Sequence, residues 1–129
     1  MSNKVYLTNK QVLLLAGELM AKIRLNTERI TMSERIYGVP RGGIPVAYAV
    51  KAKDWSMEVV DKPEDADVIV DDIICSGKTK KFYEEKYHKP FFALIDQLEL
   101  PPPMGEKEYP WYVFPWEQSL EASATDIPI

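Results

Sequence analysis

The chain has 129 residues, of which 46% are hydrophobic and 28% are charged, and its formal net charge is −4. This length gives one ordinary domain with one buried core, and the composition is that of a soluble globular protein. The negative charge disfavours a broad attraction to nucleic acid or to acidic membranes, so we expect neither as a partner.

The N-terminal segment MSNKVYLTNKQ has no apolar stretch like that of a signal peptide, and no run of residues approaches the length that spans a membrane. The single cysteine, Cys75, excludes an internal disulfide framework and suits a reducing compartment. We therefore expect the protein to be cytoplasmic.

A long amphipathic helix is predicted over NKQVLLLAGELMAKIRL, residues 9–25, with Thr8 or Asn9 as its N-cap. Its apolar residues recur at helical spacing and define one buried face, which comprises Val12, Leu15, Ala16, Leu19, Met20 and Ile23.

The rest of the chain alternates predicted strands with predicted helices. The predicted strands are residues 34–39, 55–61, 67–72 and 91–95, with 111–114 as an edge strand, and the predicted helices are residues 44–52 and 78–86. This alternation predicts one α/β domain, residues 1–117, with a Rossmann-like open, mainly parallel twisted sheet flanked by helices. The segment PPPMGEKEYP is predicted to be a loop, and residues 118–129 a flexible tail.

Two glycine-bearing turns, at residues 39–43 and 75–79, each follow a predicted strand. In an open parallel sheet the carboxyl ends of the strands meet at one edge, and ligands bind there. The two turns should therefore face one site.

The second turn belongs to VIVDDIICSGKT, residues 68–79, which ends like a nucleotide-binding P-loop. A P-loop requires a glycine five positions before Gly77, whereas this chain has Asp72 there. A carboxylate at that position would repel a triphosphate, so the P-loop interpretation fails.

The same stretch suits a smaller phosphorylated ligand. The turn precedes a helix N-terminus, whose free N–H groups favour a monophosphate, and Gly77 admits the tight turn. Asp71 and Asp72 lie a few residues upstream, and paired carboxylates accept hydrogen bonds from a vicinal diol or hold a divalent metal, directly or through water. A phosphate with a diol beside it describes a ribose 5-phosphate.

At these residues a family resemblance becomes plain. VIVDDIICSGKT resembles the phosphoribosyl pyrophosphate (PRPP) signature of the type I phosphoribosyltransferases, and YGVPRGGIPVA resembles their pyrophosphate loop in the form found in xanthine-guanine phosphoribosyltransferases. WYVFPWE is similar to the C-terminal segment of those small purine enzymes. The likeness spans roughly residues 10–117 in the correct order.

The resemblance implies transfer of the phosphoribosyl group from PRPP to a nucleobase, a purine by this likeness, to give a nucleoside monophosphate and pyrophosphate. It implies Mg²⁺ as cofactor, held by Asp72 and Asp71, which would also bind the ribose hydroxyls. Relatives commonly form dimers or tetramers, so a homo-oligomer is expected.

The resemblance also assigns the remaining site residues. The 5-phosphate would lie on Cys75, Ser76, Gly77, Lys78 and Thr79. The pyrophosphate would lie on Pro40, Arg41, Gly42 and Gly43, with a cis peptide bond at Pro40–Arg41. Trp111, Gln97 and Tyr112 would bind the base, and the catalytic set would be Arg41, Asp71, Asp72 and Cys75.

Three features depart from the family pattern and leave alternatives open. Cys75 replaces an aspartate that acts as a base, so it is either a weak base or a small loop residue. Asp96 and Gln97 stand where a lysine recognises the purine. The connection 60–67 is too short for the usual closing lid. The alternatives are a PRPP- or nucleotide-binding regulator without catalysis, and a transferase for a non-purine base.

Several side chains also have simpler structural interpretations. Trp111 is either a core residue or a stacking residue, whereas Trp116 is expected in the core. His88 follows a predicted helix among charged residues, so it is expected to be exposed to solvent.

Overall fold

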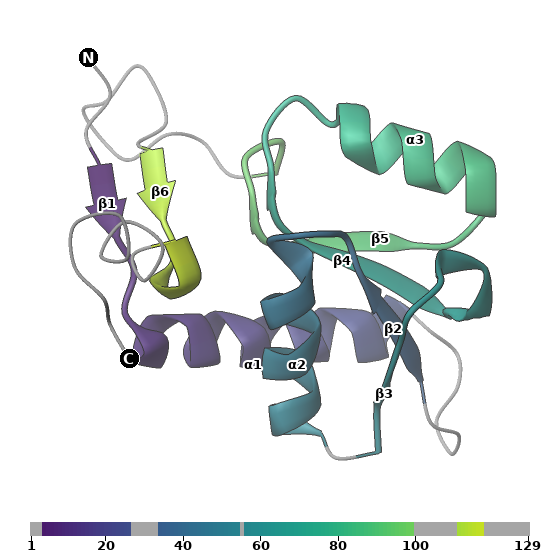
Figure 1. Ribbon diagram of the computed structural model, residues 1–129, viewed down its shortest axis with the longest axis horizontal. Coiled ribbons are helices and arrows are strands. Elements are labelled where there is room, and N and C mark those ends of the chain that lie inside the picture. Colours follow the sequence, from purple (N-terminus) through teal and green to yellow (C-terminus); the bar gives the residue numbers. More distant parts are fainter. Residues whose placement is uncertain (1–3, 27–33, 55, 100–110, 118–129) are drawn as a thin grey trace.

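The computed structural model describes residues 4–26, 34–54, 56–99 and 111–117. Within these residues four strands form one sheet, in the order β3-β2-β4-β5, and every neighbouring pair is parallel (Figure 1). The strands are β2 (Arg35–Gly38), β3 (Glu58–Val60), β4 (Val68–Ile74) and β5 (Phe91–Asp96). The predicted open parallel sheet is confirmed, and β4 extends two residues beyond the predicted strand.

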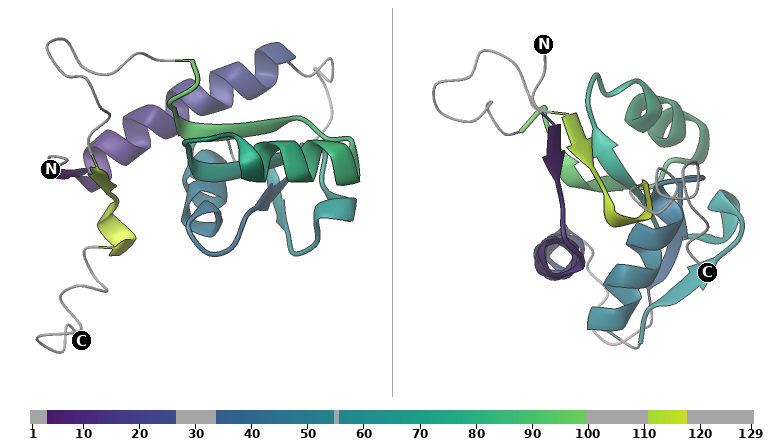
Figure 2. Two further views of the ribbon diagram at one scale, coloured as in Figure 1. Left: turned by 90° about the horizontal axis from the view of Figure 1, so that it is seen from above. Right: turned by 60° about the vertical axis from the view of Figure 1, so that its left-hand side comes forward.

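Three α-helices of the described chain cover both faces of this sheet (Figures 1 and 2). α1 (Asn9–Asn26) and α2 (Gly43–Lys53) pack on one face, and α3 (Lys78–Tyr87) covers the other. Along β4, Val68 and Val70 join the core under α1 and α2, whereas Ile69 joins the core under α3. No helix in the described ranges is long and apolar enough to cross a membrane.

The predicted strand at 111–114 exists, but it is not at the edge of the main sheet. β6 (Trp111–Val113) pairs in parallel with β1 (Lys4–Tyr6), and the two form a separate two-stranded sheet (Figure 1). β1 was not predicted, because its three residues are all exposed and show no alternation of burial. The predicted loop 101–110 and the predicted tail 118–129 lie outside the described residues.

The order of the strands brings two turns together at one edge of the sheet. From β2 the chain passes through α2 to β3 on one side, whereas from β4 it passes through α3 to β5 on the other side. The turns after β2 and β4 therefore lie next to each other at a topological switch point, where ligands bind in open α/β sheets. Between β3 and β4 there is only a short connection with one 3₁₀ turn, Pro63–Asp65, so the predicted short lid is confirmed.

The start of α1 is fixed by a reciprocal pair of hydrogen bonds. The Gln11 amide donates to Thr8 Oγ1 over 3.1 Å, and the Thr8 amide donates to Gln11 Oε1 over 2.8 Å. This is a capping box, and it identifies Thr8 as the N-cap. Beyond it the predicted apolar face packs into the core, with Val12, Ala16, Leu19 and Ile23 buried.

Removing this cap should destabilise the fold measurably. Thr8→Ala is expected to cost about 1 kcal/mol of unfolding free energy, because the Gln11 amide at the helix start loses its acceptor, Thr8 Oγ1. Thr8→Ser keeps the hydroxyl and should retain most of the stability. Thermal melts of both variants test this, and an alanine variant that melts with the wild type would contradict it.

Candidate active site

The acidic pair lies in the carboxyl-terminal half of β4, and both side chains are half-buried. Asp71 Oδ1 accepts a hydrogen bond from the Asp72 amide, and Asp72 Oδ1 accepts one from the Ile73 amide, both over 2.8 Å. Burial, together with the neighbouring charge of Asp72, raises the pKa of Asp71 to about 7. The pair therefore favours a proton, a cation or hydroxyl donors beside it.

This raised pKa has a consequence for stability. A carboxyl whose folded pKa lies above its unfolded value stabilises the fold at low pH, and that contribution is lost as the pH rises from about 4 through about 7. Asp71→Asn removes the dependence. The variant should therefore gain stability relative to the wild type between pH 5 and pH 8.5, by about 1–2 kcal/mol after allowance for solvent screening.

Denaturant melts across this pH range measure the difference directly. Asp67→Asn is not a suitable control, because Asp67 Oδ2 accepts the Arg35 amide, so the exposed Asp65→Asn is the matched control. Parallel pH curves for wild type and Asp71→Asn would contradict the assignment of the titration to this carboxyl.

The turn after β2 packs tightly against β4. The Val39 amide donates to Val70 O over 2.9 Å, and the Gly43 amide donates to Val39 O over 2.7 Å as α2 begins. A Cβ atom on Gly43 would lie 2.6 Å from Val70 O, so no larger residue fits. The peptide bond Pro40–Arg41 is cis, as the family resemblance predicted.

One contact joins this turn to the acidic pair. A Cβ atom on Gly42 would lie 2.7 Å from Asp72 Cγ, which is closer than real Cβ atoms approach other atoms. Gly42 therefore lies directly against the Asp72 carboxylate. Arg41, the neighbouring residue, is exposed at the same edge, so its guanidinium is free to meet an anionic ligand.

The turn after β4 provides the second half of the site. Gly77 has φ +86°, in the left-handed region that glycine adopts without strain, and α3 begins at the next residue. The amides of Ser76, Gly77 and Thr79 have no backbone acceptor within the described chain, as expected at a helix N-terminus. The Lys78 amide donates a long hydrogen bond, 3.4 Å, to Ser76 Oγ.

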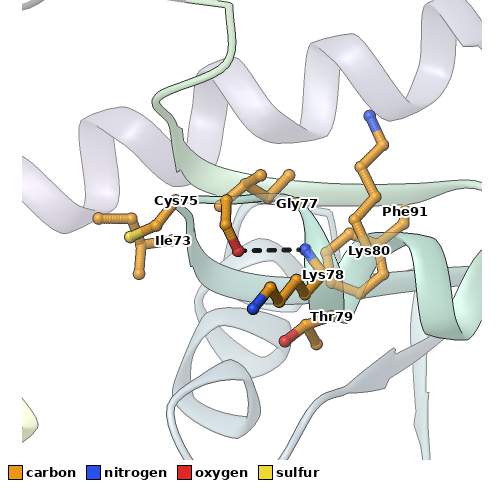
Figure 3. Close-up of a pocket in the computed structure, with 9 residues that line it drawn as sticks. Ile73, Cys75, Gly77, Lys78, Thr79, Lys80 and Phe91 are labelled. Carbon is orange, nitrogen blue, oxygen red and sulfur yellow. Dashed lines mark hydrogen bonds between the residues drawn. The ribbon is translucent and has the colours of Figure 1, made fainter.

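These residues line a cavity of about 180 Å³ together with Ile73, Ile74, Cys75, Lys80 and Phe91 (Figure 3). In Figure 3 the side chains of Lys78 and Thr79 point one way, whereas that of Lys80 points the opposite way. Lys78 thus adds positive charge and Thr79 adds a hydroxyl on the same side of the turn. Free amides, a hydroxyl and an ammonium form a suitable environment for a phosphate group.

Gly77 can be tested by substitution. Gly77→Ala forces an L-residue into the left-handed region, and its Cβ would lie 2.9 Å from Leu98 Cδ1. We expect a loss of about 1–2 kcal/mol of stability and weaker binding of nucleoside monophosphates. Gly77→Asn should lose less stability, because asparagine tolerates this conformation better. An alanine variant with wild-type melting and wild-type affinity in titration calorimetry would contradict this account.

Cys75 is exposed at the start of the turn. Partial burial, with the negative charges of Asp72 and Asp71, raises the pKa of its thiol. A thiol with a raised pKa is protonated at neutral pH, so it cannot accept a proton from a nucleobase. Of the two interpretations of Cys75, the small loop residue is therefore favoured over the catalytic base.

Sequence reasoning gave no role to Tyr37 or Tyr83, which pack against the hydrophobic cluster under α3. Their ring centroids are 6.2 Å apart, and Tyr83 also stacks on Tyr87 at 5.7 Å. Burial, followed by the hydrogen-bonded Tyr37, raises the pKa of Tyr83 to about 12, with a smaller effect from Asp71. Tyr83 and Tyr87 are four residues apart on one helix, and this spacing was the signal that could have revealed the aromatic cluster.

The predicted base-binding residues do not all lie together. Trp111 is 62% exposed, so it is not a core residue, and its stacking role stays a prediction. Tyr112 lines a second cavity, beside β5, whereas the Gln97 amide donates to Ile74 O over 2.9 Å at the end of β4. Trp116 stacks on Phe114 against the main core, with ring centroids 4.9 Å apart, as predicted. His88 is exposed and ends α3, also as predicted.

The acidic pair also bears on the expected Mg²⁺. Mg²⁺ prefers oxygen ligands, and proteins commonly bind it with one or two carboxylates together with substrate phosphates and water. Asp71 and Asp72 fit this pattern, because burial and then the neighbouring charge of Asp72 raise the pKa of Asp71, and a bound cation would offset both effects. The described residues form no group of three or more metal-ligating side chains, so the pair would share the ion with a phosphorylated ligand.

Comparisons with known proteins identify the fold. No protein-family model matches the chain, and no curated protein sequence matches it. A purine phosphoribosyltransferase from Pyrococcus horikoshii Ot3 is 24% identical with a TM-score of 0.57, over 88% of this chain and 94% of that one. A xanthine-guanine-hypoxanthine phosphoribosyltransferase from Helicobacter pylori is 17% identical with a TM-score of 0.62, over 97% and 99%.

A third solved structure, a hypothetical protein from Neisseria gonorrhoeae with bound ppGpp, is 13% identical with a TM-score of 0.62, over 98% of this chain and 97% of that one. At these sequence identities the comparisons show the fold alone. The chain has the fold of the type I phosphoribosyltransferases, as the sequence predicted.

Proposed function

We propose that the protein is a phosphoribosyltransferase that transfers the phosphoribosyl group of PRPP to a purine base, giving a nucleoside monophosphate and pyrophosphate. The observation that carries this proposal is the contact between Gly42 and Asp72. It joins a turn suited to pyrophosphate to a carboxylate pair suited to a ribose, at one edge of the sheet.

The described residues divide the binding of PRPP between them. The amides after β4, with Lys78 and Thr79, hold the 5-phosphate, and the carboxylates of Asp71 and Asp72 accept the ribose hydroxyls. The pyrophosphate lies on the turn after β2, where Arg41 offers its guanidinium. Mg²⁺, when bound, neutralises charge on the pyrophosphate.

In the reaction a ring nitrogen of the base forms a bond to C1 of the ribose as the bond from C1 to the pyrophosphate oxygen breaks. The electron pair of the broken bond leaves with pyrophosphate, and the base loses a proton to water or to the leaving group. The transition state has oxocarbenium-ion character, so the protein contributes alignment and charge stabilisation rather than a covalent intermediate. The thiol of Cys75 takes no part in this scheme.

A second candidate function is a nucleotide-binding regulator without catalysis. Two observations favour it: the connection between β3 and β4 is a single 3₁₀ turn that cannot close over the site, and the thiol at position 75 is a poor base. The similar protein from Neisseria gonorrhoeae binds ppGpp, a guanine nucleotide with two diphosphates, which is consistent with such a role.

A screen of nucleobases with PRPP and Mg²⁺ separates the two functions. Pyrophosphate release with a purine, lost in Arg41→Ala and kept in the surface control Asp65→Asn, is expected of the transferase. Tight binding of PRPP or ppGpp with no release for any base would favour the regulator. The expected homo-oligomer stays a prediction, which light scattering can test.

A further inference from the structure

The outer side of α2 is apolar although it is open to solvent. The first eight residues of this helix, GIPVAYAV, contain no charged side chain, and its inner residues pack into the main core. On the outer side, Ile44 is 42% exposed, Tyr48 is 56% exposed, and Ala52 is exposed as well. A helix that is apolar all round is normally covered on both sides, so α2 lacks a partner on its outer side.

The three outward residues are spaced four apart and form one stripe along the helix, which we call the α2 face. In Figure 1 this helix lies in front of α1. A hollow of about 110 Å³ borders the α2 face, between α2 and the ends of β2 and β3. Its lining is mainly apolar and includes Pro40, Val59 and Val60. An exposed apolar helix beside an apolar hollow is typical of a protein–protein interaction surface.

The order of side-chain sizes along the α2 face fits a second copy of the same helix. Tyr48 is the central residue of α2, which runs from Gly43 to Lys53. When two antiparallel copies meet about a two-fold axis at Tyr48, Ile44 of each copy lies opposite Ala52 of the other. A large side chain then meets a small one, and the two tyrosine rings lie beside each other at the axis. The patch is therefore complementary to itself.

The charges beside the α2 face fit the same arrangement. In an antiparallel pair the carboxyl end of one helix lies beside the amino end of the other, which also suits the helix dipoles. Lys51 lies near the carboxyl end on the side of β3, where its ammonium donates to Met57 O over 2.7 Å, and an ammonium has three donors. The exposed Asp61 follows β3 and lines the hollow with Pro40, near the amino end. Each Asp61 can thus pair with the partner's Lys51.

We infer that the α2 face is the interface of a homodimer, in which two copies of α2 pack antiparallel about a two-fold axis near Tyr48. Pro40 belongs both to the hollow and to the turn after β2, so the partner also packs beside the turn that carries Arg41. The inference goes beyond the proposed function and does not depend on it, because a transferase and a regulator can both be dimers.

Light scattering after size-exclusion chromatography tests this without any substrate. The wild type is expected to be a dimer at micromolar concentrations. Tyr48→Glu places two like charges at the axis and should raise the dissociation constant of the dimer by about a hundredfold or more. Leu14→Glu is the matched control, because Leu14 is 61% exposed on α1, and this variant should stay dimeric. Circular dichroism checks that both variants are folded.

An exchange of charges tests whether the partner is a second copy. Asp61→Lys faces the partner's Lys51 and should weaken the dimer by about threefold to tenfold, as expected for an exposed pair. The double variant Lys51→Glu/Asp61→Lys should recover most of the lost affinity in sedimentation experiments. Only a contact between two copies of this chain predicts that recovery.

A monomeric wild type would overturn the inference and leave the α2 face to a different protein. A Tyr48→Glu variant that stays dimeric would overturn it too, because the interface would then lie elsewhere. Should Tyr48→Glu not fold, cross-linking decides. In a Cys75→Ser background, oxidised Tyr48→Cys should form a disulfide-linked dimer and Leu14→Cys should not, and equal linking of the two would contradict an axis near Tyr48.

Discussion

Replacing Asp72 by asparagine is expected to lower kcat/KM for PRPP by about 10²–10³-fold while the fold is retained. The substitution keeps the shape of the side chain and its acceptor for the Ile73 amide, but it removes the negative charge. In the proposed function, binding of the ribose hydroxyls and of Mg²⁺ would both depend on that charge. Steady-state rates of pyrophosphate release measure the loss.

The loss of activity in Asp72→Asn should not come from a change in the fold. Circular dichroism and melting should match the wild type, and Asp65→Asn should retain full activity, since Asp65 lies exposed in the 3₁₀ turn away from the strand end. A value of kcat/KM within about threefold of the wild type would show that Asp72 does not meet the ribose or the metal.

Gly42→Ala is expected to reduce kcat/KM for PRPP by about 10²-fold or more, because misplacement of site groups by about 1 Å costs that much. The backbone of Gly42 has φ −64° and ψ −27°, which alanine adopts readily, so no backbone strain is involved. The effect comes from the added methyl group, which would lie 2.7 Å from Asp72 Cγ. The turn or the carboxylate must move.

Gly17→Ala is a matched control for this substitution. Gly17 lies within α1, and its added Cβ would meet only Lys53 Cε, at 3.8 Å. Alanine there should stabilise the helix by up to about 1 kcal/mol and leave the kinetics unchanged. If Gly42→Ala and Gly17→Ala had the same kcat/KM for PRPP, the contact between the turn and Asp72 would not be needed for activity.

The local features of the fold could be predicted from the sequence because short-range rules specify them. The α1 helix is specified by Thr8 and by apolar residues at helical spacing, and β4 by an uninterrupted apolar run before Asp71. The two glycine-bearing turns were located from their motifs, and the family resemblance supplied the cis bond at Pro40–Arg41.

Contacts between distant segments could not be predicted in the same way. The pairing of β1 with β6 joins residues about a hundred positions apart, and β1 has no buried face to reveal it. The contact of Gly42 with Asp72 depends on how closely α2 approaches β4. The burial of Asp96 beside Tyr112 depends on the packing of α1 and β6 against β5, which periodicity does not encode.

We propose that the turn after β4 holds a phosphate while Asp71 and Asp72 hold the ribose of the same ligand. A crystal structure with a bound nucleoside monophosphate tests it most directly. We expect phosphate oxygens within about 3.2 Å of the amides of Ser76 to Thr79, and both ribose hydroxyls within hydrogen-bond distance of the two carboxylates. A nucleotide whose phosphate lies elsewhere, or whose ribose does not meet either aspartate, would contradict it.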